Sequence, residues 1–206
     1  MDGASNQEIE VKFYLCKLED IDLRLKGLQA EVVQTRTFEY NLRFDTPEGE
    51  LSRNFQVIRL RRDTASRLTY KGRSRVIGGV SLRDEIEFTV GDFEEAKSFL
   101  DALGYQVSLV YEKFRRVYAF GGVFVTLDEL PFGDFVEIEG PDGASIRAVS
   151  RELGLDWEVR IVESYAALFQ TARRNLGLNM TNLTFDDFEL VSVLPDDLGV
   201  QPADAP

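Results

Sequence analysis

The feature that most constrains this chain is a two-residue alternation of charged and apolar side chains near its start. Glu8, Glu10 and Lys12 alternate with Ile9 and Val11. In a β-strand successive side chains point to opposite faces, so a strand here places two carboxylates and an ammonium on one face and branched apolar side chains on the other. The segment therefore predicts a strand with one polar and one apolar face.

The same alternation recurs in six later segments, and there the charges are sorted by sign. A solvent-facing strand usually mixes both signs with Ser, Thr and Gln, whereas each of these segments carries mainly one kind of charge. The charged members are Arg59 and Arg61, Lys71, Glu85 and Glu87, Lys113 and Arg115, Asp128, and Glu137 and Glu139. If these strands join the first in one closed sheet with the charges inward, the interior holds seven carboxylates and six basic groups. Unpaired buried charge is costly, so this interior is predicted to be a binding channel and not a dry core.

The remaining periodicity predicts a single domain at residues 1–178 and a C-terminal tail at residues 179–206 that is partly disordered beyond Pro195. A chain of 206 residues with 44% hydrophobic residues, including 15 Phe, can bury one substantial core. Helices are predicted near 18–28, 92–104, 143–154 and 162–176, and a mobile loop at 73–79. Strands are predicted at 7–15, 31–44, 55–63, 66–72, 82–90, 105–120, 122–128 and 134–140. The predicted fold class is α+β, a closed eight-stranded antiparallel β-barrel, or tunnel, with helices packed outside.

Composition excludes several classes of function. A net charge of −12 argues against general nucleic-acid binding, which needs a basic surface. The chain has no histidine and a single cysteine, Cys16, which excludes imidazole-dependent triads, His-ligated metals, an intramolecular disulfide and a Cys-based zinc site. The first residues show neither a basic leader nor an apolar stretch, and no run reaches the roughly 18 apolar residues of a membrane span. We therefore expect a cytoplasmic protein without nucleic-acid or membrane partners.

Eight short motifs in a fixed order make the pattern specific. They are the motif of Glu8, Glu10 and Lys12 and the segments 44–47, 58–61, 68–72, 83–87, 112–115, 127–128 and 133–139. Over residues 7–170 this set resembles the signature of the CYTH superfamily, the triphosphate tunnel metalloenzymes. The resemblance implies a tunnel that binds a triphosphate with a divalent metal. Three activities recur in this superfamily: hydrolysis of inorganic triphosphate, hydrolysis of thiamine triphosphate and, in class IV adenylyl cyclases, conversion of ATP to cyclic AMP and pyrophosphate.

The two charge sets suit the two parts of a metal–triphosphate complex. Hard cations near phosphates prefer carboxylate oxygens. We therefore predict Mg²⁺ or Mn²⁺ as cofactor, bound by an acidic wall of Glu8, Glu10, Glu85, Glu87, Asp128, Glu137 and Glu139. Arginine grips phosphate oxygens bidentately and lysine supplies a compact charge, so the predicted triphosphate-binding set is Lys12, Arg59, Arg61, Lys71, Lys113 and Arg115. Within this set Lys12, Arg59 and Lys113 are the predicted catalytic residues.

Strand phase separates other residues from the predicted channel. We place Arg62, Arg83 and Arg116 out of phase with the inward face and expect them to meet solvent or external partners. Arg43 stands where related sequences often carry an aromatic residue before the Phe-Asp turn. Tyr40 and Arg43 are three positions apart, so only one of them can point into the channel.

We predict an enzyme that is a triphosphatase dependent on Mg²⁺ or Mn²⁺ and that hydrolyses inorganic triphosphate. No segment indicates a nucleobase pocket, and an arginine-rich channel suits a naked polyphosphate. Class IV adenylyl cyclase, thiamine triphosphatase and a non-catalytic binder of polyphosphate or nucleotide remain alternatives. The expected partner is a small-molecule triphosphate, bound by a monomer or a homodimer.

Overall fold

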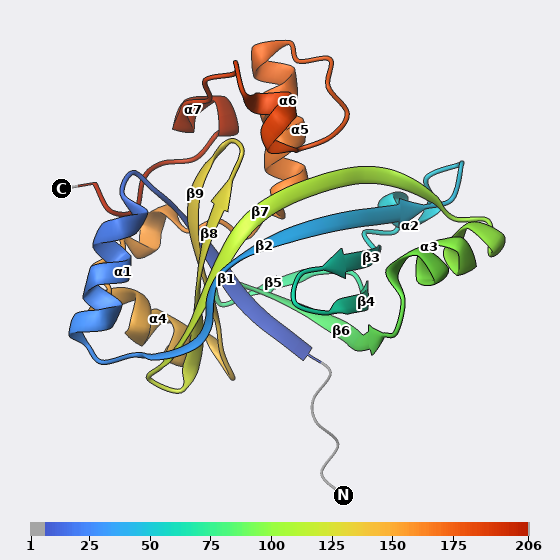
Figure 1. Cartoon of the computed structure of the whole chain (residues 1–206). Coiled ribbons are helices and arrows are strands. Elements are labelled where there is room, and N and C mark those ends of the chain that lie inside the picture. Colours follow the sequence, from blue (N-terminus) through green and yellow to red (C-terminus); the bar gives the residue numbers. More distant parts are fainter. Residues whose placement is uncertain (1–6, 206) are drawn as a thin grey trace, which may run out of the picture.

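The computed structural model describes residues 7–205, and its main feature is a closed ring of eight antiparallel strands (Figure 1). Residues 1–6 and 206, at the ends of the predicted domain and tail, lie outside the described residues. In order around the ring the strands are β1 (Gln7–Leu15), β9 (Gly133–Glu139), β8 (Val123–Leu130), β7 (Gln106–Phe120), β2 (Glu31–Asp45), β3 (Val57–Arg62), β4 (Ser66–Lys71) and β6 (Val80–Val90). β6 pairs with β1 and closes the ring. The α+β tunnel predicted from the alternation is confirmed.

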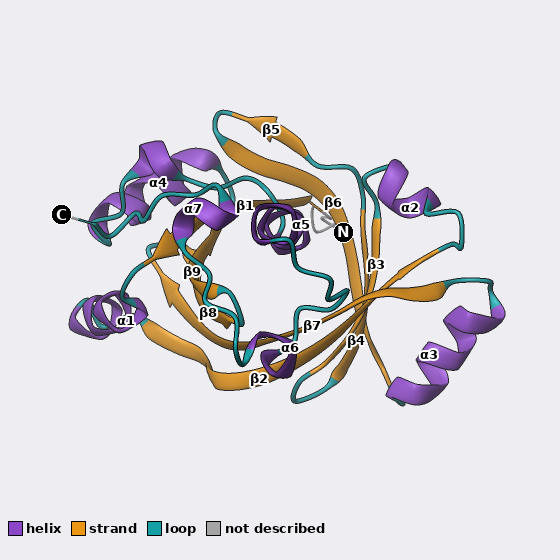
Figure 2. Ribbon diagram, turned by 90° about the horizontal axis from the view of Figure 1, so that it is seen from above, coloured by secondary structure: helices purple, strands orange, loops and turns teal. Residues whose placement is uncertain are grey.

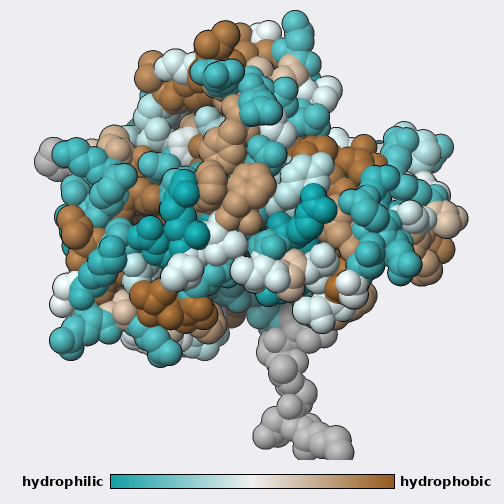
Figure 3. Space-filling view, in the orientation of Figure 1, coloured by the Kyte–Doolittle hydropathy of each residue, from teal (hydrophilic) through white to brown (hydrophobic). Residues whose placement is uncertain are grey.

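Helices lie around the outside of the ring and over one of its openings (Figure 2). They are α1 (Leu18–Gly27), α2 (Glu50–Arg53), α3 (Phe93–Ala102), α4 (Gly143–Glu152), the 3-10 helix η1 (Trp157–Val159), α5 (Tyr165–Leu176), α6 (Phe185–Phe188) and α7 (Pro195–Leu198). In the part of the chain that the structure describes, no helix combines the length and the apolar character needed to cross a membrane. Hydrophobic residues on the face shown in Figure 3 form separate small areas among hydrophilic ones.

A ninth strand, β5 (Arg75–Ile77), corrects the prediction of a mobile loop at residues 73–79. β5 pairs antiparallel with β6, with Ile77 opposite Val80. Gly78 and Gly79 connect the two strands with φ angles of 62° and 85°. Two successive positive φ values suit the tight turns of twisted hairpins, and glycine adopts them without steric cost. The glycine pair therefore marks a hairpin turn.

The apolar faces of the strands pack outward against helices, which leaves the inside of the ring to polar side chains. On one side α1 and α4 cover β1, β8 and β9, where Val11, Val125 and Ile138 are fully buried. On the other side α3 packs Phe93 and Leu100 onto β2 and β3. The period of two thus sorts each strand between an outer core and an inner polar face.

The C-terminal segment is folded in the described residues, which differs from the expected disorder. Residues 165–200, which we call the cap, carry α5, α6 and α7 and lie together over one end of the ring (Figure 1). Beyond the cap, the Asp204 carboxylate accepts 2.8 Å hydrogen bonds from the backbone N–H groups of Cys16 and Lys17. Pro195 occupies the first turn of α7, where a missing N–H costs nothing. The Pro and Asp residues of this segment begin helices and turns.

Leu198 tests whether the cap contributes to stability. Its side chain is 2% exposed in the apolar cluster beneath the cap, whereas Leu190 is 95% exposed. We expect Leu198→Ala to lower the free energy of unfolding by about 2–4 kcal/mol because it leaves a cavity. The control Leu190→Ala should change it by less than about 0.5 kcal/mol. Urea denaturation followed by circular dichroism measures both, and two equally small losses would contradict a packed cap.

Candidate functional site

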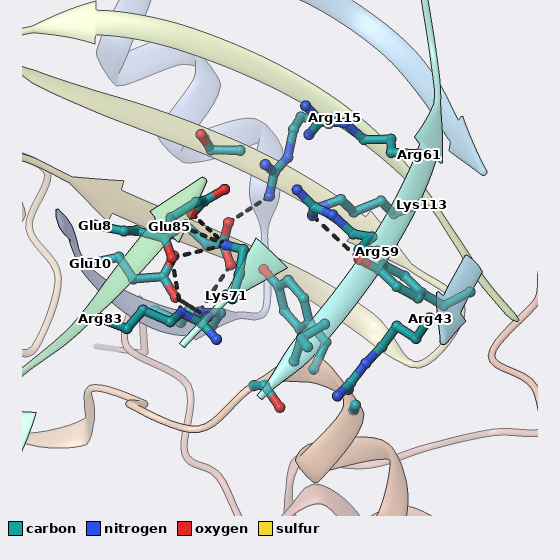
Figure 4. Close-up of a pocket in the computed structure, with 18 of the residues that line it drawn as sticks. Glu8, Glu10, Arg43, Arg59, Arg61, Lys71, Arg83, Glu85, Lys113 and Arg115 are labelled. Atoms are coloured by element: carbon teal, nitrogen blue, oxygen red, sulfur yellow. Dashed lines mark hydrogen bonds and ion pairs between the residues drawn. The ribbon is translucent and has the colours of Figure 1, made fainter. Parts of the chain in front are cut away.

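A polar cavity of about 330 Å³ lies within the ring (Figure 4). Inward side chains of all eight ring strands and a few residues of the C-terminal segment line it. It brings together twelve of the thirteen predicted site residues. These are Glu8, Glu10, Lys12, Arg59, Arg61, Lys71, Glu85, Glu87, Lys113, Arg115, Glu137 and Glu139.

Asp128 is the predicted site residue that does not line the cavity. Arg59, Arg61, Lys113 and Arg115 form what we call the basic wall of the cavity. Asp128 is fully buried behind it, with Oδ2 2.9 Å from Lys113 Nζ. It also accepts hydrogen bonds from Arg115 and, at 3.0 Å, from the hydroxyl of Tyr165 on α5. Its position suits the ordering of two basic side chains better than direct contact with a metal in the cavity.

Glu8 and Glu10 on β1 are held by basic side chains of β4 and β6. Lys71 Nζ lies 2.7 Å from a Glu8 oxygen and 2.9 Å from a Glu85 oxygen. Arg83 Nε lies 3.0 Å from Glu8, and its Nη2 lies 3.5 Å from Glu10. Burial opposes the ionisation of Glu8, but Lys71 and Arg83 outweigh it and hold the pKa of Glu8 well below its usual range. Glu8 is therefore a charged carboxylate shared by two cations.

Arg83 corrects our assignment of strand phase. It has the same parity as Glu85 and Glu87 on β6, and it lies directly opposite Glu8 on β1. Its side chain therefore enters the cavity with theirs. The period of two was sound, and the error was in counting it at this position.

The other phase assignments are confirmed. Arg62 points outward, with its guanidinium 5.5 Å from the centre of the Tyr40 ring, and Arg116 pairs with Asp22 on α1. Of the pair three positions apart on β2, Arg43 lines the cavity, while Tyr40 packs on the outer apolar cluster. Strand phase alone does not decide which of the two points into the ring, and in the structure it is Arg43.

Lys12 connects the acidic wall to the cap. Its Nζ lies 2.6 Å from Glu10 and 3.1 Å from Glu137. Burial opposes the charge, but these carboxylates raise the pKa of Lys12 above its usual value. The same Nζ lies 5.5 Å from the centre of the Tyr165 ring. Sequence reasoning missed Tyr165, because a residue that begins a helix after the barrel gives no strand-phase signal.

Arg59 and Arg61 on β3 share one acidic partner. Glu87 lies 3.2 Å from Arg59 Nη2 and 3.1 Å from Arg61 Nη2. Arg59 also donates a long hydrogen bond of 3.5 Å to the hydroxyl of Tyr111. Tyr111 lines the cavity and was missed, although it shares the strand phase of Lys113 and that phase could have revealed it.

Glu39 on β2 is a carboxylate that sequence reasoning missed, and like Asp128 it is buried behind the basic wall. It is fully buried, 3.5 Å from Arg61 Nη1 and 3.7 Å from Lys113 Nζ. Burial opposes its ionisation, but Lys113, Arg115 and Arg61 lower the pKa of Glu39 to about 2. Its phase within the predicted strand matches that of Arg43, so the sequence contained its signal.

Glu139 is the lining carboxylate that has no basic partner within residues 7–205. Desolvation in the cavity, together with Glu8, Glu10 and Glu85, raises the pKa of Glu139 to about 7, although part of its side chain is exposed. Among the described residues no group of three or more His, Cys, Asp or Glu is arranged to hold a metal, and Lys71 Nζ pairs with both Glu8 and Glu85. The oxygen donors still fit a hard divalent cation. Such an ion would displace Lys71 and relieve the repulsion at Glu139.

Known proteins resemble this chain in sequence and in fold. Adenylate cyclase CyaB of Aeromonas hydrophila is 30% identical over 134 residues, which cover 64% of this chain and 67% of that protein. A Vibrio parahaemolyticus protein provisionally described as an adenylate cyclase has a TM-score of 0.69 at 22% identity, covering 79% of this chain and 97% of its own. A Pyrococcus horikoshii OT3 protein has a TM-score of 0.65 at 29% identity, and the match covers 77% of this chain and 96% of that protein.

A plant structure has a similar fold over most of the chain. It is a Hippeastrum protein provisionally described as an adenylyl cyclase and reported to have a dominant triphosphatase activity, with a TM-score of 0.63, 19% identity and coverage of 94% of this chain and all of its own. The family model of the CYTH domain matches residues 6–150, which contain every strand of the ring. This chain therefore belongs to the CYTH domain family.

Proposed function

We propose that this protein is a divalent-metal-dependent enzyme that binds a triphosphate inside the ring and hydrolyses inorganic triphosphate. The observation that carries the proposal is the convergence of eight basic and six acidic side chains on one cavity of about 330 Å³. Polyphosphate and hard-metal recognition need these two kinds of group held side by side. The activities named for its relatives, adenylate cyclase and triphosphatase, both act on triphosphates.

The charge balance supports this substrate class. Together with Glu39 and Asp128, which are buried behind the lining, eight carboxylates face eight basic groups, so the site is formally neutral. A triphosphate carries about −4 to −5 charges near neutral pH, and two divalent cations carry +4. A complex of the two therefore changes the total charge of the site little. Binding exchanges internal ion pairs for pairs with the ligand.

The basic wall is suited to hold phosphoryl oxygens in place. Phosphoryl transfer needs positioning and charge stabilisation more than covalent help. Arg59 and Arg61 reach in from β3, and Lys113 and Arg115 reach in from β7. Each of these donors is already aligned by a carboxylate, and we assign this ordering role to Asp128 for the two residues of β7. We assign catalysis to Arg59, Lys113 and Lys12, which would stabilise charge as it develops on the transferred group.

The acidic wall is suited to the cofactor. Glu8, Glu10, Glu85 and Glu139 would hold Mg²⁺ or Mn²⁺ through carboxylate oxygens. When bound, the cation would neutralise phosphoryl charge and activate water for hydrolysis. Glu137, a further member of the acidic wall, connects it to the basic side chains, because it pairs with both Lys12 and Arg115.

Adenylyl cyclase is the second candidate, and the 30% identity to CyaB favours it. Cyclisation would require a seat for adenosine that brings a ribose hydroxyl in line with the α-phosphorus. The aliphatic side chains on the lining are few, namely Val57, Leu109, Ala166 and Leu183. Because most of the lining is charged, a naked polyphosphate suits the cavity better than a nucleoside does.

A panel of substrates separates these activities. We expect purified protein to release phosphate from inorganic triphosphate with Mg²⁺ or Mn²⁺, faster than from ATP or thiamine triphosphate, and to lose this activity with EDTA. Cyclic AMP is measured in the same ATP reactions. Cyclic AMP as the main product would identify a cyclase, faster release from thiamine triphosphate would identify a thiamine triphosphatase, and binding without any product would leave a non-catalytic binder.

Variants of the two walls should separate substrate binding from metal binding. Arg59→Ala and Lys12→Ala remove charge-assisted bonds to phosphate, so KM for inorganic triphosphate should rise about tenfold or more while the Mn²⁺ affinity changes little. Glu139→Ala should instead weaken Mn²⁺ binding about tenfold, as titration calorimetry measures. Arg62→Ala, outside the ring, is the matched control. Equal and negligible effects of all the variants would contradict the division of roles.

Metal affinity should depend on pH through Glu139. A carboxyl group with a pKa of about 7 is protonated below that pH, and the proton competes with the metal. The Mn²⁺ affinity should therefore be full above pH 8 and fall as the pH decreases from 7 to 5, by up to about tenfold per unit. Glu139→Gln should flatten this dependence. A constant wild-type affinity from pH 5.5 to 8.5 would rule out this explanation.

A further inference from the structure

Arg43 differs from every other basic side chain on the cavity lining. The other seven each have a carboxylate oxygen within 3.2 Å, as in the pairs of Arg59 with Glu87 and of Arg83 with Glu8. Within residues 7–205 the guanidinium of Arg43 takes part in no ion pair and no hydrogen bond, although it lines the same cavity. An unpaired cation in a partly desolvated position is costly for the protein alone.

Arg43 lies where the ring meets the cap. On β2 it is opposite Leu109 of β7, and Leu109 belongs to the apolar cluster beneath the cap. Leu183, which follows α5, also lines the cavity. Its backbone carbonyl oxygen accepts a 2.9 Å hydrogen bond from the backbone N–H of Glu112 on β7. In Figure 4 the side chain of Arg43 lies apart from the group formed by Glu8, Glu10 and Glu85.

Arg83 and Arg59 add positive charge to the surroundings of Arg43. Burial, together with Arg83 and Arg59, lowers the pKa of Arg43, and the partial compensation comes from Tyr111 and Asp45. The Asp45 carboxylate is already occupied by backbone N–H groups of the following turn. A bound anion would relieve this repulsion, whereas a neutral ligand group would bury the charge further.

We propose that Arg43 binds an anionic end of the substrate beneath the cap, so that the tunnel prefers an unesterified polyphosphate to a nucleoside triphosphate. The inference rests on the proposed triphosphate function. An inorganic polyphosphate is charged at both ends and can reach the paired basic wall and Arg43 together. An ester such as ATP has a neutral sugar at one end, and that end would meet the unpaired guanidinium. Arg43 is thus a specificity-determining residue of the site.

Titration calorimetry of inorganic triphosphate and of ATP, both with Mg²⁺, tests the proposal on the full chain. The variants are Arg43→Gln, the charge-retaining Arg43→Lys, and Arg62→Gln as a control from the neighbouring strand that points outside. Arg43→Gln should raise Kd for inorganic triphosphate at least about tenfold and Kd for ATP less than about threefold. Arg43→Lys should recover most of the affinity for triphosphate. Phosphate release is followed in the same samples.

Thermal unfolding without ligand separates this role from a structural one. Because Arg43→Gln removes an unpaired charge, its Tm should equal or exceed that of the wild type. A lowered Tm, an unchanged Kd for triphosphate, or equal losses for triphosphate and ATP would each overturn the proposal. If the wild type binds triphosphate through Arg43 but releases no phosphate, the hydrolase proposal fails and this one stands. If the wild type releases phosphate and Arg43→Gln binds triphosphate as tightly as the wild type does, the hydrolase proposal stands and the proposed role of Arg43 fails.

Discussion

The pairing of β1 with β6 is the contact on which the rest of the structure depends. It closes the sheet and sets Glu8 opposite Arg83, so that charges from distant segments face one another. In an open sheet the same side chains would be solvated separately. Inside the closed ring the lower dielectric strengthens each attraction and also raises the cost of any unpaired charge. Helices cover the apolar outer faces, and the inner faces therefore hold the ion pairs.

The ion pairs give the cavity its order before any ligand arrives. Asp128 is fully buried and bonds to Lys113, Arg115 and the cap residue Tyr165, so two basic groups share one fixed anchor. Side chains that are already held lose less conformational freedom when they bind a ligand. A bound ligand takes the place of carboxylate partners of basic side chains that are already aligned. The cap helps to keep these side chains aligned through Tyr165.

Strand phase predicted the closed sheet and most of the cavity lining, because the period of two holds along each strand. The phase tells whether a side chain points into the ring, but it does not tell whether that side chain reaches the cavity. Asp128 points into the ring and is nevertheless buried behind the cavity lining. Arg83, Tyr111 and Glu39 obey the phase and were within reach of the sequence. Contacts between distant segments leave no local pattern, so the Asp204 bond to Cys16 could not be predicted.

The sharing of charges within the ring limits how its residues can evolve. Glu87 forms ion pairs with both Arg59 and Arg61, and Lys71 forms ion pairs with both Glu8 and Glu85. A change of charge at one such position leaves its partners without an opposite charge. Substitutions there are therefore epistatic and persist only with compensating changes nearby. Arg43 stands outside these shared pairs among the described residues. This position can therefore mutate alone, and new ligand preferences can arise there without rebuilding the ring.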